Sequence, residues 1–232
     1  MRPAYLDDSY LREFRAKVTS ANGSSVVLDK TIFYPQSGGQ PSDQGSLFCG
    51  EEEFKVARAE VADGNVIHVL DREGLANGDE VRGVLDWDRR YKLMRGHTAC
   101  HILSAIIFKG TGAKITGNQI DLGRSRVDFS LEKFDKSQMA GYIEAANKVV
   151  GDDREVATRF LFKEEAMKVP DLIRLAMDVP DREEIRVVEI SGVDAQACGG
   201  THVKRTGEVG TIKLVKAENK GKANRRVYFD VD

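Results

Sequence analysis

Residues 86–110 read DWDRRYKLMRGHTACHILSAIIFKG, and they separate two different kinds of sequence pattern. Apolar or small residues recur at a helical spacing from Tyr91 to Phe108, which predicts a helix over Arg89–Phe108. An aspartate in front of this stretch offers an N-cap, and we expect Gly110 to end the helix. The segment therefore predicts a long helix that starts at a domain boundary near residue 88.

Before this helix, the sequence is typical of short strands that are broken by turns. Asp63-Gly64-Asn65 separates two apolar runs and predicts a β-hairpin, whereas Asp8–Phe14 offers at most a helical turn or two. Residues 1–88 are therefore expected to form a small β-barrel domain, with a sandwich as the other simple arrangement. The predicted strands are Ser25–Asp29, Arg58–Val61, Val66–Leu70 and Glu80–Asp86.

After the helix, strands and helices follow one another without regular alternation. We expect further helices over Ser137–Val150 and Lys163–Ala176, the second interrupted or ended near Pro170. The pattern predicts an α+β fold for the chain, with residues 89–232 as an α+β metal-binding domain. The predicted strands of this domain are Arg124–Ser130, Glu155–Phe162, Ile185–Ile190, Gly210–Ala217 and Arg225–Val231.

The composition excludes two large classes of protein. With 232 residues, 41% of them hydrophobic, the chain can bury an apolar core in one large or two small domains. Three widely spaced cysteines do not make a disulfide framework. Apolar runs such as Ile102–Phe108 are far shorter than the roughly 20 residues of a membrane-spanning helix. With no apolar stretch at the N-terminus, we expect a cytoplasmic protein and no membrane partner.

The net charge of −2 hides a strong variation along the chain. Residues 1–88 hold 9 basic and 16 acidic residues, whereas residues 89–126 hold 8 basic residues and one acidic residue. Residues 203–226 hold 8 basic and 2 acidic residues. Two basic segments in a slightly acidic protein indicate a local surface for a polyanion, although two solvated element faces would give the same counts.

Three of the four histidines fall into two short clusters, His97-x-x-x-His101 and Cys198-x-x-x-His202. On a helix, residues i and i+4 share one face, so His97 and His101 can direct both imidazoles to one point. Gly199-Gly200 allows a tight bend that brings Cys198 and His202 together. Three nitrogens and one sulfur suit tetrahedral Zn²⁺, and we expect one zinc ion per chain at these four residues.

Other readings of the same residues are less favourable. A zinc peptidase would need a glutamate as general base where Thr98 follows His97, so that class is excluded. His68 lies in a predicted strand and is expected to be structural. Cys100 points away from the histidine face and is expected in the core, and Cys49 is expected in a loop.

The segment Phe33-Tyr34-Pro35-Gln36-Ser37-Gly38-Gly39-Gln40-Pro41 is the second unusual element. Its paired glycines allow positive φ angles and a close approach of a ligand to the backbone N–H groups. Gln40 adds a neutral donor and acceptor. Taken alone, the segment favours an ordinary loop between barrel strands. Its Gly-Gly-Gln tripeptide also occurs in peptide release factors, but the chain lacks the rest of their sequence context.

With these motifs assembled, the chain resembles the AlaX family of free-standing alanyl-tRNA editing proteins, which is related to the editing domain of alanyl-tRNA synthetase. The glycine-rich β domain before the metal motifs is similar to the longer AlaX class. The combination of HxxxH with CGGTH is highly specific. The matching residues, in family order, are Leu28-Asp29-Lys30-Thr31, Phe33-Tyr34-Pro35, Gly38-Gly39-Gln40, Arg95-Gly96-His97 to His101, Arg126 to Ser130, and Cys198-Gly199-Gly200-Thr201-His202.

The resemblance implies hydrolysis of mischarged tRNA(Ala), chiefly of tRNA(Ala) that carries serine, with glycine as the second candidate. It implies that the metal ligands His97, His101, Cys198 and His202 form the catalytic site. It also implies substrate contacts from Thr31, Gly38, Gly39 and Gln40, with Thr31 reading the serine hydroxyl. The basic segments adjoin the metal motifs, and phosphate contacts are expected from Arg89, Arg90, Lys92, Arg95, Lys204 and Arg205.

Two questions stay open at this level. Four protein ligands make a closed site, which is typical of structural zinc. Either Cys198 or His202 is loosely bound, or the zinc ion positions and polarises the substrate while nearby groups activate water. A different class of function, a zinc-stabilised RNA-binding module without catalysis, is the alternative to the hydrolase.

Overall fold

The computed structural model describes residues 2–131, 136–169, 171–172 and 183–232. The chain divides into two compact units, Met1–Leu93 and Met94–Asp232. Helix α1, Trp87–Thr111, begins in the first unit and continues into the second. The predicted boundary near residue 88 therefore falls just inside this helix. The fold is α+β, as the sequence predicts.

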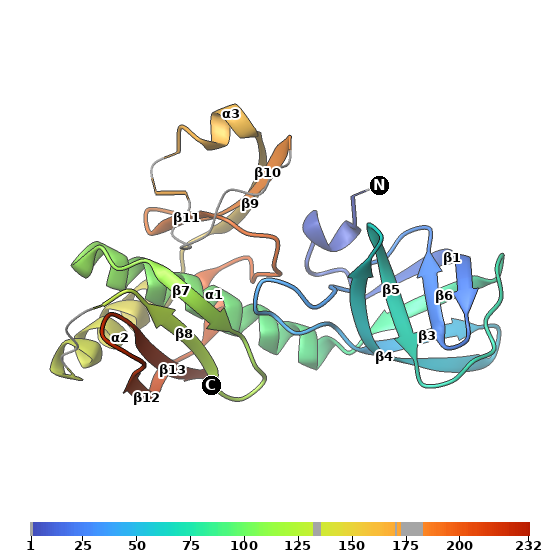
Figure 1. Ribbon diagram of the computed structural model, residues 1–232, viewed down its shortest axis with the longest axis horizontal. Helices are drawn as coiled ribbons and strands as arrows, with labels where there is room; N and C mark the ends of the chain where they lie inside the picture. Colours follow the sequence, from blue (N-terminus) through green and yellow to red (C-terminus); the bar gives the residue numbers. More distant parts are fainter. Residues whose placement is uncertain (1, 132–135, 170, 173–182) are drawn as a thin grey trace. The chain divides into compact units, whose positions relative to one another are not determined.

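The first unit is a closed six-stranded barrel, which confirms the predicted fold class (Figure 1). Its strands follow the order β1-β2-β5-β4-β3-β6, and every pair is antiparallel. A short 3₁₀ helix, Ala4–Leu6, precedes them. The strands are β1 (Glu13–Asn22), β2 (Ser25–Leu28), β3 (Gly45–Cys49), β4 (Glu52–Ala62), β5 (Asn65–Leu70) and β6 (Glu80–Leu85).

The predicted hairpin joins β4 to β5. Asp63 and Gly64 have φ angles of 50° and 76° in the turn, and Val61 pairs with Val66 beside it. Alternate residues of each strand point inward and fill the barrel with apolar side chains. The expected helical turns at Asp8–Phe14 are wrong, because β1 starts at Glu13 and pairs with β6. Cys49 ends strand β3, so its expected place in a loop is also wrong.

Helix α1 confirms the main helical prediction. The Asp86 carboxylate accepts a hydrogen bond from the Arg89 amide at 3.1 Å, which caps the first turn. The predicted stop at Gly110 is wrong: the helix continues to Thr111, and Gly112 follows with a φ angle of +71°. Among the described helices, none is both long and apolar enough to cross a bilayer.

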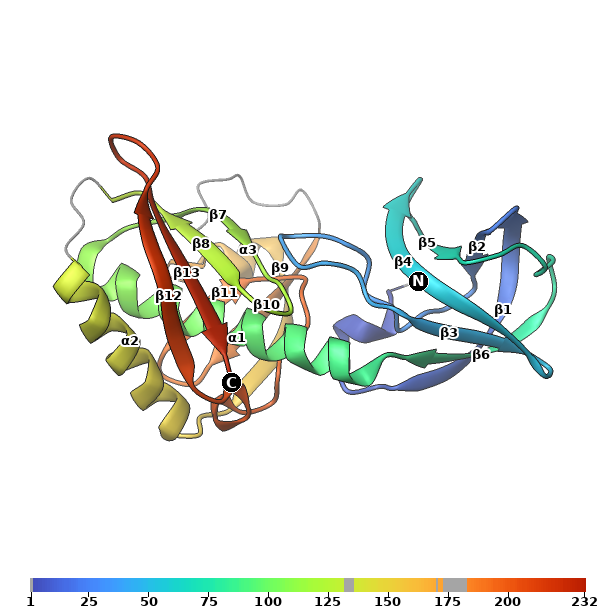
Figure 2. The same ribbon diagram turned by 90° about the horizontal axis from the view of Figure 1, so that it is seen from below.

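The second unit contains two sheets. One has four strands in the order β12-β13-β8-β7, and the other has three in the order β11-β10-β9. Figure 2 shows the long β12–β13 hairpin and helix α2 beside β12. The elements are β7 (Ile115–Gln119), β8 (Ser125–Phe129), α2 (Lys136–Gly151), β9 (Val156–Phe162), α3 (Lys163–Ala166), β10 (Glu184–Ile190), β11 (Asp194–Ala197), a 3₁₀ helix (Thr206–Val209), β12 (Ile212–Asn219) and β13 (Arg225–Val231).

The third predicted helix is much shorter than expected. Helix α3 covers only Lys163–Ala166, and Met167–Val169 form turns instead of further helix. The rest of the predicted span, Pro170 and residues 173–176, lies outside the described residues. The remaining strand predictions in this unit are met to within a few residues, whereas the short strands β7 and β11 were not expected.

Asn147 of helix α2 closes one end of the edge strand β12. Its side-chain amide donates to the Ile212 carbonyl at 2.9 Å, and its side-chain oxygen accepts from the Ile212 amide at 2.8 Å. A side chain therefore makes the two hydrogen bonds that a neighbouring strand would make at this residue.

His68 lies in β5, as predicted, and is fully buried in the barrel unit. Its Nδ1 is 3.3 Å from the Val26 carbonyl, and its Nε2 is 2.8 Å from the Thr31 hydroxyl. Burial lowers the pKa of His68 from 6.5 to about 4, against the opposing effect of the hydrogen bond to Val26. The folded barrel therefore holds a neutral imidazole at mildly acidic pH.

We expect His68 to make the barrel less stable in mild acid. Below pH 6.5 the His68 imidazole binds a proton in the unfolded chain, whereas in the folded unit it stays neutral down to about pH 4. The free energy of unfolding therefore falls as the pH is lowered from 6.5 to about 4. The loss should reach up to about 3 kcal/mol, and His68→Gln should lack it. The free energy of unfolding of the parent and of His68→Gln is measured by urea unfolding at pH 7.5 and pH 5, with the fluorescence of the single tryptophan Trp87 as the signal. An equal loss in parent and variant would contradict the assignment.

Candidate metal centre

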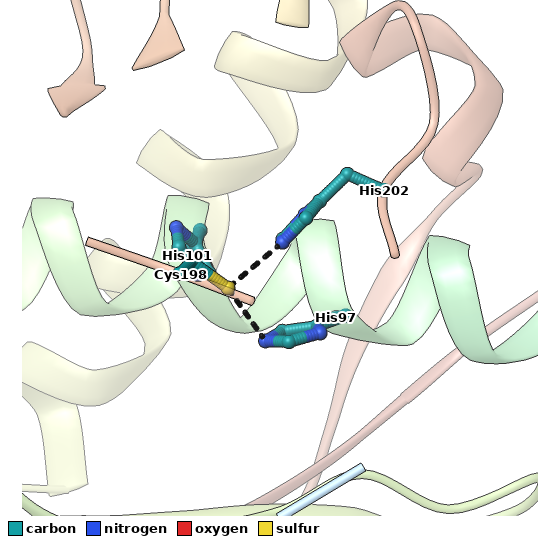
Figure 3. Close-up of side chains that lie close together, drawn as sticks. All are labelled: His97, His101, Cys198 and His202. Atoms are coloured by element: carbon teal, nitrogen blue, oxygen red, sulfur yellow. Dashed lines mark hydrogen bonds between the residues drawn. The ribbon is translucent and has the colours of Figure 1, made fainter. Parts of the chain in front are cut away.

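The four predicted ligands converge in the second unit (Figure 3). His97 and His101 project from one face of helix α1, while Cys198 and His202 lie on the loop after strand β11. The ligand atoms of all four lie within 4.8 Å of one another, and the three imidazoles are buried. Chain segments about a hundred residues apart thus form one compact group that could hold a metal ion.

The distances within the group suit a small tetrahedral ion. The Cys198 sulfur lies 3.3 Å from His202 Nε2 and 3.7 Å from His97 Nε2. Bond lengths of about 2.3 Å to sulfur and about 2.0 Å to nitrogen place these atoms about 3.5 Å apart around a tetrahedral centre. Three imidazoles and one thiolate are also ligands that favour a borderline-soft divalent metal. The residues therefore fit a metal ion both in spacing and in chemistry.

The charges in the group favour an ionised sulfur. Burial alone would raise the pKa of the Cys198 thiol, but His97 and His202 and the hydrogen bonds from His101 and His202 hold it well below its ordinary value. Burial likewise opposes a charge on His101, yet Asp194 and Cys198 raise the pKa of that imidazole to about 10. Burial, with the charge of His97, holds the pKa of His202 well below its ordinary value.

Two of the imidazoles are oriented by partners behind them. The Asp194 carboxylate is 3.2 Å from His101 Nδ1, and the same oxygen accepts a hydrogen bond from the Gln196 amide at 2.7 Å. The Thr98 hydroxyl is 3.0 Å from His202 Nδ1 and also accepts from the Val203 amide at 3.3 Å. Such contacts fix the ring plane and leave the opposite nitrogen directed at the metal position.

Arg186 holds the backbone of the cysteine loop. Its guanidinium donates to the carbonyls of Cys198 at 2.8 Å and Gly200 at 2.9 Å, and its own carbonyl accepts from the Cys198 amide at 3.0 Å. The Gly200 amide in turn points at the Cys198 sulfur at 3.3 Å. Strand β10, which carries Arg186, therefore sets the position of the thiolate.

Comparison with known proteins gives the family of this chain. An alanyl-tRNA editing protein AlaX-M from Methanosarcina mazei is 46% identical over 98% of the chain and 95% of its own length. The chain belongs to the alanyl-tRNA editing protein family. A second relative of the same name, from Saccharolobus solfataricus, is 43% identical over 98% of the chain and 97% of its own length.

The family is also related to longer synthetases. An alanine–tRNA ligase from Ignicoccus hospitalis is 36% identical over 98% of the chain but over only 26% of its own length. The family model of the threonyl and alanyl tRNA synthetase second additional domain matches residues 185–228, which include the CGGTH loop. A model of class II (A) tRNA synthetases matches residues 8–89, which cover the barrel.

In this editing-family chain, the glycine-rich segment forms a tight turn within the barrel unit. Gly38 and Gly39 have φ angles of +56° and +82°, and Ser37 and Gln40 bridge the turn through two backbone hydrogen bonds. Gln40 is fully buried in this structure. The Thr31 hydroxyl contacts His68 and accepts from the Phe33 amide at 3.0 Å. The expected substrate contacts of these residues stay predictions.

Arg90 is not an RNA-binding residue in this structure, and that prediction is wrong. Its side chain is fully buried and forms an ion pair with the equally buried Asp43. It also donates to the carbonyls of Ser9 at 2.8 Å and Ile32 at 2.6 Å. All three nitrogens of this guanidinium donate to acceptors in the barrel unit, and the side chain is fully buried, so a phosphate cannot reach it.

The other basic residues of the prediction differ in how exposed their side chains are. Lys92 and Lys204 are exposed, and Arg205 is exposed but paired with Asp153 at 2.6 Å. Arg89 donates to the Ser42 carbonyl at 3.0 Å, and Arg95 donates to the Val209 carbonyl at 2.9 Å. Their contacts with RNA stay predictions.

The sequence analysis missed the residues that support the ligands, namely Asp194, Gln196 and Arg186. Asp194 and Gln196 stand four and two residues before Cys198, a spacing that gives a strand the same face for both side chains. That alternation was a usable signal. No local pattern marks Arg186, because its role depends on the pairing of β10 with β11.

Loss of the Asp194 carboxylate should weaken metal binding. We expect Asp194→Asn to lower the affinity for Zn²⁺ by about 10–100-fold, because His101 then faces a neutral amide instead of the negatively charged carboxylate that orients its ring and makes it more basic. Competition with a chromogenic chelator measures the affinity. The matched control is Glu144→Gln, which removes the same charge from an exposed site on α2. This variant should bind Zn²⁺ with the affinity of the parent. Equal affinity in all three proteins would contradict a supporting role for Asp194.

Proposed function

We propose that this protein is a trans-acting hydrolase that deacylates tRNA(Ala) mischarged with serine, and also tRNA(Ala) mischarged with glycine. The observation that carries the proposal is the compact group of three buried histidines, His97, His101 and His202, with Cys198, in a chain that belongs to the alanyl-tRNA editing family over nearly its whole length. An aminoacyl ester is an activated substrate, and a compact charged centre suits the polar transition state of its hydrolysis.

We further propose that the four residues hold one Zn²⁺ ion per chain and form the catalytic site. When bound, zinc supplies Lewis-acid charge that can polarise an ester carbonyl. The protein supplies the rest: Asp194 orients His101, Thr98 orients His202, and Arg186 holds the loop that presents Cys198. These contacts keep the ligands in place before a substrate arrives, so that little reorganisation is needed during the reaction.

The exposed basic residues beside the metal motifs are proposed to bind the phosphates of the tRNA. Lys92, Lys204 and Arg205 are the accessible members, and Arg89 and Arg95 keep part of their surface exposed. Contacts to phosphates would fix the register of the RNA without reading its sequence. They release counterions, so tRNA binding should weaken as the salt concentration rises.

Release of free serine from Ser-tRNA(Ala) tests the function directly. We expect hydrolysis well above the spontaneous rate, and a strong reduction in Cys198→Ala because the ligand set is broken. Cys49→Ala removes a thiol of the barrel unit and should behave like the parent. Tight tRNA binding without serine release would instead favour a zinc-stabilised RNA-binding module. Gly-tRNA(Ala) in the same assay tests the second substrate.

Thr31 is proposed to read the serine hydroxyl. A site that hydrogen-bonds this group can reject alanine, whose side chain would leave a buried polar partner unpaired. Thr31→Val should lose about 1–3 kcal/mol of the serine preference, while Thr31→Ser, which keeps the hydroxyl, should retain it. The measurement is kcat/KM on Ser-tRNA(Ala) and Ala-tRNA(Ala). If Thr31→Val discriminates like the parent, the hydroxyl is read elsewhere, with Thr98, Thr201 and Gln40 as the next candidates.

A further inference from the structure

The barrel unit is acidic, yet several of its basic side chains gather in one place without pairing to a carboxylate. Residues 1–88 contain nine Lys and Arg against 16 Asp and Glu. Five of the nine lie outside the depression described below, and each of these five is held by a carboxylate or an aromatic ring. These contacts are Arg2 with Asp7, Arg12 over Trp87, Lys55 with Glu53, Arg58 with Glu60, and Arg72 with Glu52.

The four remaining cations, Arg15, Lys17, Lys30 and Arg82, line one open depression of about 580 Å³ on the outside of the barrel. In the described part of the chain, the side chains of Arg15, Lys17 and Lys30 make no hydrogen bond or ion pair. Arg82 lies 3.5 Å from Glu13, at the long end of an ion pair. With so many carboxylates available in this unit, three unpaired cations at one place are not expected from chance pairing.

The strand register makes the arrangement costly by itself. Arg15 on β1 is directly opposite Arg82 on β6, and like charges in this position destabilise a sheet. Arg15 and Lys17 are two residues apart on β1, so they share the outer face. An anion bound between them would offset this repulsion.

The two carboxylates that line the depression do not neutralise it. The Asp29 carboxylate already accepts a hydrogen bond from the Lys17 amide at 2.8 Å. Glu80 is opposite Lys17 in the register, but the two charged groups do not form an ion pair within the described residues. Phe48 adds a half-buried ring that the Arg82 guanidinium covers at 4.6 Å. Four cations in one depression form a surface that suits a chain of phosphates.

We propose that this depression binds the phosphodiester backbone of the RNA substrate, at a site separate from the basic residues that flank the metal ligands. The inference rests on the proposed function, which supplies an RNA as the partner. Arg15, Lys17 and Lys30 contact the phosphates, and Arg82 on Phe48 forms the wall of the site. The acidic surroundings confine this binding to the depression.

Lysine labelling of the unaltered protein tests the site without any mutation. Acetylation by an amine-reactive ester, read by mass spectrometry, should fall at Lys17 and Lys30 when uncharged tRNA(Ala) is added. Lys55, which is exposed in the same unit but paired with Glu53, is the internal reference and should keep its reactivity. Inorganic phosphate at the same phosphate concentration should protect neither lysine. Unchanged reactivity with tRNA, or equal protection by free phosphate, would overturn the inference.

Charge reversal gives an independent measurement. We expect Arg15→Glu to weaken tRNA(Ala) binding by about tenfold and to lower the slope of log Kd against log salt by about one. Arg58→Glu makes the same charge change on another exposed barrel strand and should bind within about twofold of the parent. Equal affinities of the two variants would overturn the inference.

Serine release by the unaltered protein keeps the two proposals apart. If Ser-tRNA(Ala) is hydrolysed while Lys17 and Lys30 stay reactive, the inference fails and the proposed function stands. If the lysines are protected while no serine is released, the RNA site stands and the proposed hydrolase fails.

Discussion

Burial of three imidazoles beside helix α1, with the partly buried thiol of Cys198 among them, is the constraint on which the second unit depends. His97 and Cys198 are 101 residues apart, and their meeting requires the β10–β11 pairing to bring the cysteine loop against the helix. Buried polar groups must find partners, because an unpaired one is costly. Asp194, Thr98 and Arg186 provide those partners, so the sheet and the ligand group support one another.

The same reasoning explains which parts of the fold could be predicted. Helix α1 could be predicted from its local apolar periodicity, and the β4–β5 hairpin from its turn residues. The structure contains both elements. Strand β1 was missed because its outward positions are charged and polar, so that only Ala16 and Val18 are fully buried among its ten residues. Helix α3 was overestimated because its apolar spacing suggested a longer helix than the turns at Met167–Val169 permit.

The candidate site shows a similar division. The ligands were predictable because HxxxH and CGGTH bring the chemistry together within five residues each. The basic residues beside them were harder, since charge alone does not distinguish a phosphate contact from a buried ion pair. Arg90 is the example: it is adjacent to Arg89 in sequence, but the next helical position turns it towards Asp43 in the interior. Only the three-dimensional structure assigns the two arginines to different environments.

The amide of Asn147 has a consequence for the behaviour of the protein at high concentration. Strand β12 is at the edge of the four-stranded sheet, and Leu214 and Val215 are exposed on it. An open edge of this kind is a template for strand addition and fibrous aggregation between molecules. Asn147 occupies the backbone groups of Ile212, and Lys213 and Lys216 place charge along the same strand. Asn147 thus closes one end of the edge, and the two lysines, which pair with Asp232 and Glu218, keep charged side chains along the rest of it, which disfavours the addition of another strand.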